Sequence, residues 1–224
     1  MKFVDKIKKI KRLRPANISD NISAFNRARK FTYFLETIKP KPTDSILDVG
    51  FADIEYSDVD NYLEKNYPHQ SQITALGVSG SEHFSKRYPD VNIVLYDGKI
   101  FPFEDKSFDI GWSNAVIEHV GNQDAQLLFL QELHRTCKQV FFTTPNRYFP
   151  VEFHTRIPLL HWLPKSVFDS VLKKTKKKWA AGDYMNLLSI RQIQSLLKKA
   201  SVTHYAIKKN RLCGFVMDYC IIIQ

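Results

Sequence analysis

Three polar positions that directly follow short apolar runs are the residues of this sequence best suited to bind a ligand. Asp97 ends one β-prone run, and Ser113 with Asn114 ends the next. Ligands of an open parallel sheet bind beyond the carboxyl ends of its strands, so these side chains are expected at one rim. A carboxylate there can accept hydrogen bonds from an exocyclic amine such as that of adenine, and Gly98 lets the backbone approach a flat ring. Taken alone, Asp97 fits a surface turn equally well.

Further reactive side chains are concentrated in the segment 144–164, which contains TPNRYFPVEFH and PLLHWLP. Arg147 has the charge to hold a carboxylate or phosphate, and Glu152 or His154 could remove a proton from an attacking hydroxyl. Prolines fix such a loop at low entropic cost, which suits the wall of a site. The alternative is that Arg147 and Glu152 form a structural ion pair and that His161 only packs.

Glu118 and His119 form another candidate acid and base pair, at the expected start of a helix. Their alternative role is packing at that helix start. The histidines and carboxylates lack the compact spacing of a metal site, so we expect no metal.

Hydrophobic periodicity predicts strands that alternate with helices, which is typical of a parallel sheet covered on both faces. The expected strands are 45–50, 73–78, 93–96, 108–112 and 139–143, and the expected helices are 20–39, 58–66, 82–88, 124–136 and 189–199. The last two β-prone runs, 202–207 and 215–223, are separated by a short polar turn, which favours an antiparallel pair.

Four segments, DVG at 48–50, DGKIFPF at 97–103, SFD at 107–109 and VIEHV at 116–120, resemble class I S-adenosylmethionine-dependent methyltransferases, most of all the methyltransferase type 11 group. The resemblance covers roughly residues 44–143, and the segment 144–164 resembles that of a bacterial subgroup. It implies a Rossmann-like α/β fold with a mostly parallel seven-stranded sheet, an antiparallel edge strand and helices on both faces. It also implies S-adenosylmethionine as the cofactor, with contacts from Asp48, Gly50, Phe51, Ser79, Asp97, Gly98, Ser113 and Asn114.

The chain departs from the family pattern at two cofactor positions. Two further glycines usually follow Gly50, where this chain continues with Phe51, Ala52 and Asp53. The second strand usually ends in an acid that binds both ribose hydroxyls, where this chain has Ser79, which offers a single uncharged hydrogen bond. We therefore keep two hypotheses. The first is a methyltransferase acting on a small anionic acceptor, such as a glycan or lipid intermediate. The second is a catalytically weak or inactive protein of the same fold that binds an anionic partner.

The chain of 224 residues, 44% of them hydrophobic, is long enough for one domain with a substantial core. We divide it into an N-terminal helical extension (1–40), a cofactor core (44–143), an acceptor-side insertion (144–186) and a C-terminal helix with a β-hairpin (187–224). No apolar run reaches the roughly 20 residues of a membrane span, and the N-terminus is too charged for a signal peptide. We expect a soluble, cytoplasmic protein with reduced thiols at Cys137, Cys213 and Cys220.

The net charge of +10 is concentrated in two segments. Residues 1–14 have a balance of +6 and residues 165–178 a balance of +5, which leaves the rest close to neutral. Both segments could contact an anionic membrane surface, the first as an amphipathic helix. The alternatives are a helix packed on the domain with a solvated basic face, and a mobile loop. Nucleic acid is a weaker candidate partner because neither segment is interleaved with aromatic residues.

Overall fold

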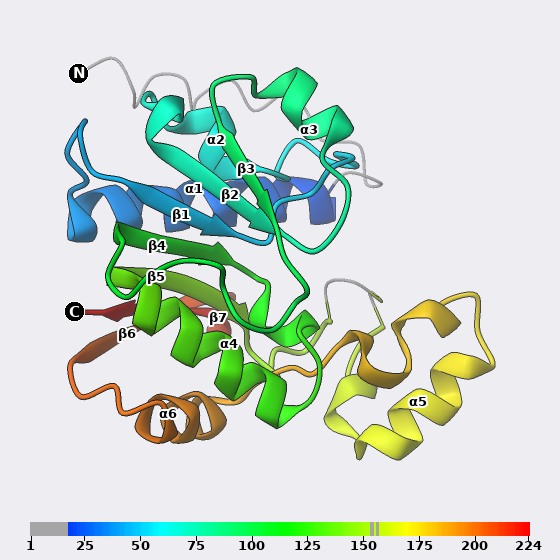
Figure 1. Ribbon diagram of the computed structural model, residues 1–224. Helices are drawn as coiled ribbons and strands as arrows, with labels where there is room; N and C mark the ends of the chain where they lie inside the picture. Colours follow the sequence, from blue (N-terminus) through cyan, green and yellow to red (C-terminus); the bar gives the residue numbers. More distant parts are fainter. Residues whose placement is uncertain (1–17, 153–154, 156) are drawn as a thin grey trace.

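A computed structural model describes residues 18–152, 155 and 157–224. These residues form one seven-stranded sheet with the order β3-β2-β1-β4-β5-β7-β6, shown in Figure 1. The strands are β1 (Ile46–Val49), β2 (Ile73–Gly77), β3 (Asn92–Leu95), β4 (Phe108–Asn114), β5 (Cys137–Pro145), β6 (Tyr205–Leu212) and β7 (Phe215–Ile223). Strands β1 to β5 pair in parallel, and β7 is antiparallel to both β5 and β6. The mostly parallel sheet is confirmed, and its reversed strand lies one position inside the edge strand β6.

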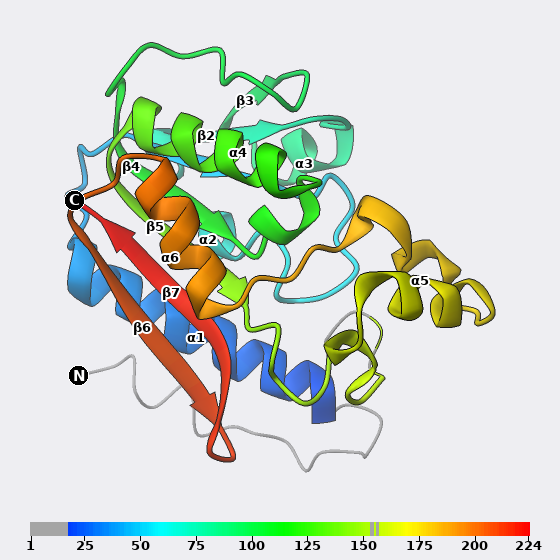
Figure 2. The ribbon, with the colours of Figure 1, turned by 90° about the horizontal axis from the view of Figure 1, so that it is seen from below.

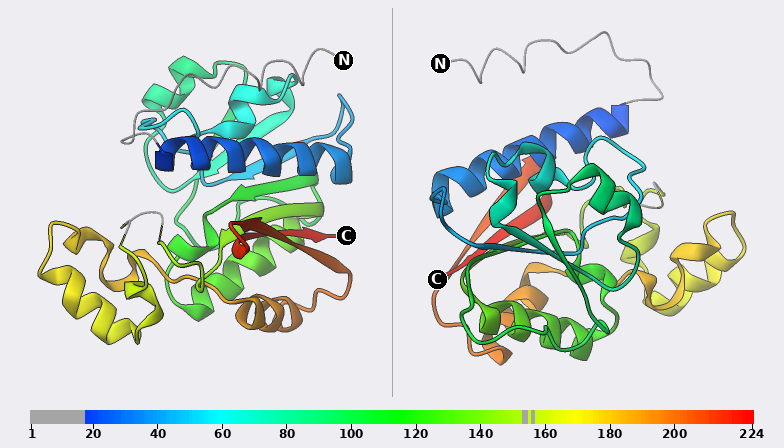
Figure 3. Two further views of the ribbon diagram at one scale, coloured as in Figure 1. Left: turned by 180° about the vertical axis from the view of Figure 1, so that it is seen from behind. Right: turned by 45° about the horizontal axis from the view of Figure 1, so that its top comes forward.

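Two layers of helices cover the sheet (Figures 1 and 3). The α-helices are α1 (Ile18–Ile38), α2 (Tyr62–Asn66), α3 (Glu82–Arg87), α4 (Gln123–Thr136), α5 (Lys165–Lys173) and α6 (Ile190–Lys199). Short 3-10 helices are η3 (Gln70–Gln72), η4 (Ile117–His119), η5 (Leu160–Trp162), η6 (Lys178–Ala180) and η7 (Gly182–Tyr184). Helices α1, α2 and α3 lie on one face, and α4 and α6 lie on the other.

The apolar faces of the helices explain these layers. On the α1 face, Phe34 lies edge-on to Trp112 with ring centroids 4.8 Å apart, and Trp112 stacks on Phe141 at 5.2 Å. On the opposite face, Leu133 of α4 and Leu196 of α6 belong to a second buried cluster. Because strands of a parallel sheet are buried on both faces, each cluster requires its own helix layer.

Helix α2 is shorter than the sequence pattern predicts. The carboxylate of Asp60 accepts hydrogen bonds from the backbone nitrogens of Tyr56 and Ser57, at 2.8 and 2.9 Å, which closes a turn. Asn61 then adopts a left-handed conformation with φ of 47°. The helix therefore begins at Tyr62 and not at Asp58, because local side-chain hydrogen bonds compete with the helix.

The insertion between β5 and α6 forms a lobe that projects from the carboxyl-end side of the sheet (Figures 1 and 2). Helix α5 lies in this lobe, where Phe168, Leu172, Ala180 and Met185 make a small buried cluster of their own. None of the helices in the described ranges combines the length and apolarity that a bilayer crossing requires.

Candidate active site

The carboxyl ends of β1, β2 and β4 and the segment after β3 border a crevice of about 680 Å³. This size lies in the range of roughly 300–1,000 Å³ that is common for small-molecule sites. The residues lining it are Val49, Gly50, Phe51, Ala52, Asp53, Ile54, Tyr56, Leu76, Gly77, Val78, Ser79, Gly80, Tyr96, Gly98, Val116, His119 and Val120. Five of the predicted site residues therefore meet here, namely Gly50, Phe51, Ser79, Gly98 and His119.

Gly50 allows the chain after β1 to meet the chain after β4. Its φ is +101°, and a Cβ added to it would lie 2.4 Å from Cγ2 of Val116. A side chain at this position would therefore be strained and would collide with Val116. Ala115, the residue before Val116, has a φ of 61°, an uncommon conformation for a non-glycine residue. The floor of the crevice thus depends on two unusual backbone conformations.

The ring of Phe51 fills the space beside Gly77, the last residue of β2. A Cβ added to Gly77 would lie 2.6 Å from Cε1 of Phe51, and the ring centroid of Phe51 is 4.4 Å from that of Phe84. The large side chain is accommodated because β2 ends in glycine. Phe51 therefore supplies an apolar wall next to Ser79.

Side chains hold the loop in which the two expected glycines are missing. Asn61 accepts a hydrogen bond from the nitrogen of Ala52 and donates one to its carbonyl oxygen, both at 2.8 Å. The Asp53 carboxylate accepts from the nitrogens of His83 and Phe84 at the start of α3, at 2.9 and 3.0 Å. The loop is therefore fastened to α2 and α3 instead of being made compact by glycine.

Glu55 also fastens this loop to α2 and α3. Its carboxylate lies 2.8 Å from Nζ of Lys65, accepts from Oη of Tyr88 at 2.6 Å, and pairs with Arg87. Burial alone would raise the pKa of Glu55, but the bonds from Lys65, Tyr88 and Asn61 outweigh it and lower the pKa to about 2. This depressed pKa stabilises the fold above the unfolded-state pKa of about 4.5, and the contribution is lost as the pH falls through about 2.

The rim after β3 contains the predicted adenine-binding pair. Tyr96 and Gly98 line the crevice, and Gly98 has a φ of +81°. Asp97 between them is exposed, and its Oδ1 accepts a hydrogen bond from the nitrogen of Lys99 at 3.0 Å. Its carboxylate thus shapes this turn at the edge of the crevice.

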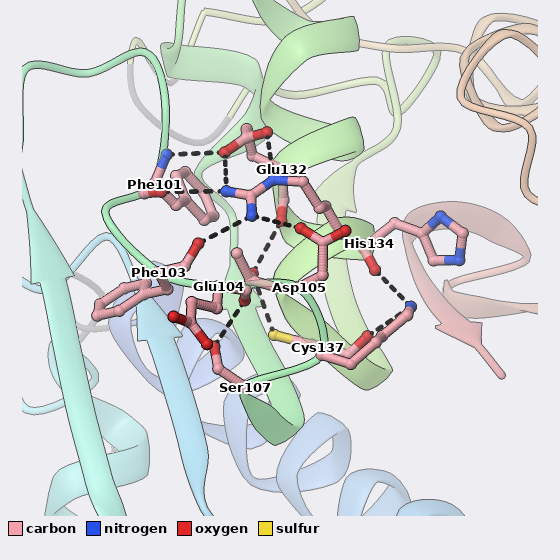
Figure 4. Close-up of polar contacts among 11 residues, drawn as sticks. Phe101, Phe103, Glu104, Asp105, Ser107, Glu132, His134 and Cys137 are labelled. Atoms are coloured by element: carbon pink, nitrogen blue, oxygen red, sulfur yellow. Dashed lines mark hydrogen bonds and ion pairs between the residues drawn. The ribbon is translucent and has the colours of Figure 1, made fainter.

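Arg135 of α4 fixes the segment that follows this rim. Figure 4 labels its partners Phe101, Phe103, Asp105 and Glu132. Its guanidinium donates to the carbonyl oxygens of Phe101 and Phe103, at 3.1 and 2.8 Å, and to Asp105 at 2.8 Å. It also donates to both oxygens of Glu132, at 2.9 and 2.6 Å, and Glu132 in turn accepts from the nitrogen of Phe101 at 2.8 Å. The FPFED segment is therefore a structural clasp between β3 and α4.

Three further predicted cofactor residues lie behind the lining of the crevice. Ser113 is buried and its hydroxyl lies 3.2 Å from the carbonyl oxygen of Val49, while Oδ1 of Asn114 accepts from Thr143 at 2.6 Å. Asp48 is buried on the α1 face, where burial and the Glu64 carboxyl raise the pKa of Asp48 well above its usual value. These side chains position the ends of β1 and β4.

The predicted acid, base and anion-binding residues do not form one cluster. His119 lines the crevice, with Nδ1 2.8 Å from the carbonyl oxygen of Tyr184. Arg147 lines a separate cavity of about 300 Å³ between the lobe, α4 and α6, together with His161 and Lys165. Glu152 is buried and accepts from the nitrogen of Thr155 at 2.5 Å. His154 lies outside the described residues.

Sequence patterns missed several residues around this crevice. Tyr56 and Tyr96 line it, although neither belongs to one of the motif segments. Arg27 and Lys30 also reach the strand ends from α1. The only sequence signal for these cations was their position among the apolar residues of an otherwise buried helix face.

Comparison with known proteins places this crevice in a known fold. Residues 58–140 match the model of a family described as a methyltransferase domain. A S-adenosylmethionine-dependent methyltransferase from Methanosarcina mazei matches with a TM-score of 0.55 at 13% identity, over 82% of this chain and 92% of that chain. One from Aquifex aeolicus gives a TM-score of 0.54 at 15% identity, over 98% and 96%. The chain has the class I methyltransferase fold.

A third match to this methyltransferase fold comes from the N-terminal domain of EvdMO1, whose structure contains S-adenosylhomocysteine. Its TM-score is 0.51 at 13% identity, over 88% of this chain and 80% of that chain. No match to the sequence was found among curated proteins. The family match begins after the loop 50–54 and ends within β5. It therefore leaves out the loop without glycines, helix α1 and the lobe.

Proposed function

We propose that the protein is an S-adenosylmethionine-dependent methyltransferase that acts on a small anionic acceptor. The observation that carries this proposal is the crevice at the carboxyl ends of β1, β2 and β4, in the fold of proteins that use this cofactor. S-adenosylmethionine supplies an electrophilic methyl group when bound. The protein then needs chiefly to position a nucleophile and to exclude water.

The residues that line the crevice, together with Asp97 at its edge, fit this cofactor. Asp97 and the backbone at Gly98 would bind the adenine, and Ser79 would bind one ribose hydroxyl. The glycine backbone at Gly50 and the wall formed by Phe51 would hold the methionine portion. The missing ribose acid makes a weak cofactor complex the expected consequence, since Ser79 offers no charge-assisted hydrogen bond.

Titration with S-adenosylhomocysteine tests both the function and the place of the adenine. We expect the wild-type protein to bind it, and Asp97→Ala to weaken binding by about tenfold, the loss of one charge-assisted hydrogen bond. Calorimetry gives the affinity. Asp90→Ala, which removes another exposed aspartate outside the crevice, is the matched control and should leave the affinity unchanged.

Two results would contradict the proposal at different points. Absence of both heat and a thermal shift at millimolar S-adenosylhomocysteine would favour the inactive protein of the same fold. Normal binding by Asp97→Ala would leave the function standing but would remove the adenine from this rim.

The lobe favours a membrane surface as a second partner of the enzyme. Trp162, Leu163, Val167, Val171 and Trp179 are each between 39% and 49% exposed, although all are large apolar residues. Lysines at 173, 174, 176, 177 and 178 follow on the same lobe. Exposed tryptophan next to lysine is typical of proteins that lie on anionic lipid. We propose that the protein is cytoplasmic and contacts an anionic bilayer through the lobe. The other predicted segment, residues 1–14, lies outside the described residues.

Vesicle sedimentation tests the membrane contact. The triple substitution Lys174→Gln, Lys176→Gln and Lys178→Gln should weaken binding to phosphatidylglycerol vesicles by roughly 100-fold, since each lysine contributes about 1 kcal/mol. The double substitution Lys198→Gln and Lys199→Gln removes exposed lysines of α6 and is the control. Equal losses in both variants, or equal binding to phosphatidylcholine, would refute a specific role for the lobe.

A further inference from the structure

A small cavity of about 120 Å³ lies between α1 and the ends of β4, β5 and β7. Its polar lining consists of Asn26, Arg27 and Lys30 from α1 and Asp218 from β7. Asn26, Lys30 and Asp218 are at least nine-tenths buried. The cavity therefore places charged groups where they are costly unless each has a partner.

Asp218 and Lys30 satisfy one another. The Asp218 carboxylate accepts from Nδ2 of Asn210 at 2.7 Å and from Nδ2 of Asn26, and lies 3.7 Å from Nζ of Lys30. Nζ of Lys30 is also 3.4 Å from Oγ1 of Thr143. Both oxygens of the Asp218 carboxylate therefore already have donors.

Arg27, in contrast to Asp218, has few hydrogen-bond partners in the described part of the chain. Among the described residues, the guanidinium has one polar contact, from Nη1 to the carbonyl oxygen of Asn114 at the long distance of 3.4 Å. Burial lowers the pKa of Arg27, whereas the carboxylates of Asp60 and Glu118 raise it from beyond ion-pair distance. A guanidinium carries five donors in a planar fork, and most of these remain for a ligand.

The cavity shares two walls with the crevice. Val59 lines the cavity and Tyr56, from the same loop, lines the crevice. Likewise Ala115 lines the cavity and Val116 lines the crevice, because the left-handed backbone at Ala115 turns consecutive side chains in different directions. A group bound beside Arg27 is therefore next to the cofactor position.

Size and charge select the group. The volume of about 120 Å³ equals that of roughly four water molecules at about 30 Å³ each. The cavity therefore admits one small polar group of a ligand and not a whole substrate. Arg27 and Lys30 against Asp218 leave one positive charge, which matches a monoanion better than a phosphate dianion. We propose that Arg27 binds the carboxylate of the methyl acceptor in this cavity. That the bound carboxylate belongs to a methyl acceptor rests on the proposed methyltransferase function. The binding of a carboxylate beside Arg27 is tested independently of that function.

Acetate is the probe, compared with inorganic phosphate and with chloride at equal ionic strength. We would titrate the full chain by NMR, both alone and saturated with S-adenosylhomocysteine. The wild-type protein should bind acetate in preference to phosphate. Arg27→Gln should weaken acetate binding at least ~10-fold, which is the effect of losing a charged hydrogen-bond pair. The acetate affinity of Arg27→Lys should lie between those of the wild type and of Arg27→Gln.

Two further variants keep the test decisive if Arg27→Gln folds poorly. Ser23→Leu narrows the same cavity from α1 without changing charge, and it should also weaken acetate binding. Arg191→Gln removes an exposed arginine of α6 and should have no effect.

The possible outcomes separate this inference from the proposed function. Acetate binding that depends on Arg27, without any binding of S-adenosylhomocysteine, would support carboxylate binding in the cavity and refute the methyltransferase function. Binding of S-adenosylhomocysteine together with acetate affinity equal in wild type and Arg27→Gln would overturn the cavity alone. Loss of acetate binding in Arg147→Gln but not in Arg27→Gln would move the carboxylate to the other cavity, and tighter binding of phosphate would refute a carboxylate.

Discussion

Replacing Arg135 with methionine is expected to lower the free energy of unfolding by about 3 kcal/mol, the low end for removing one partner of a buried ion pair. The low end applies because the Arg135 side chain is 29% exposed, whereas that of Glu132 is only 7% exposed. The variant removes the cationic partner of Glu132 and the guanidinium donor to the carbonyl oxygens of Phe101 and Phe103. Urea denaturation monitored by circular dichroism measures the loss.

The same substitution should also weaken binding of S-adenosylhomocysteine, because the clasp at 101–105 follows directly after the Asp97 rim. Arg191→Met, on the exposed face of α6, is the control and should change stability by less than about 0.5 kcal/mol. Arg135→Lys should recover only part of the stability, since an ammonium cannot reach four groups in one plane. A fully stable Arg135→Met variant would show that the clasp is not what holds this loop.

Replacing Glu64 with glutamine is expected to stabilise the protein, and the gain should grow with pH. Glu64 is fully buried beside Asp48, and burial raises the pKa of both carboxyls above the unfolded-state values. Acids with raised pKa values stabilise the fold below the unfolded pKa and lose this contribution as the pH rises through the folded pKa. The amide of glutamine carries no charge and can donate to Asp48, so we expect a gain of about 2 kcal/mol near pH 8 and little gain near pH 4.

Thermal unfolding of wild type and Glu64→Gln across this pH range measures the effect. Glu36→Gln, at an exposed position of α1, is the matched control and should give parallel curves. A variant that is less stable than wild type at alkaline pH would mean that the Glu64 carboxylate has a cationic partner in solution.

Local patterns were sufficient for most elements of the sheet domain and insufficient for the lobe and for side-chain contacts. Helix α4 and strand β2 lie within a residue of the predicted positions, because hydrophobic period and flanking turns depend on near neighbours. Helix α2 was predicted too long, because Asp60 and Asn61 bind the preceding loop. The lobe helix α5 was not predicted at all.

The sequence by itself determined the order of strands and helices, the methyltransferase resemblance and the placement of Gly50, Ser79 and Gly98 on one crevice. These follow from a parallel sheet, in which every strand end reaches the same edge. Only the tertiary structure decided that Asp48 faces Glu64, that Arg135 clasps the loop after Asp97, and that Arg27 lies beside the crevice. The partners in these contacts are separated by 16 to more than 80 residues, and no local periodicity encodes which side chains such distant segments bring together.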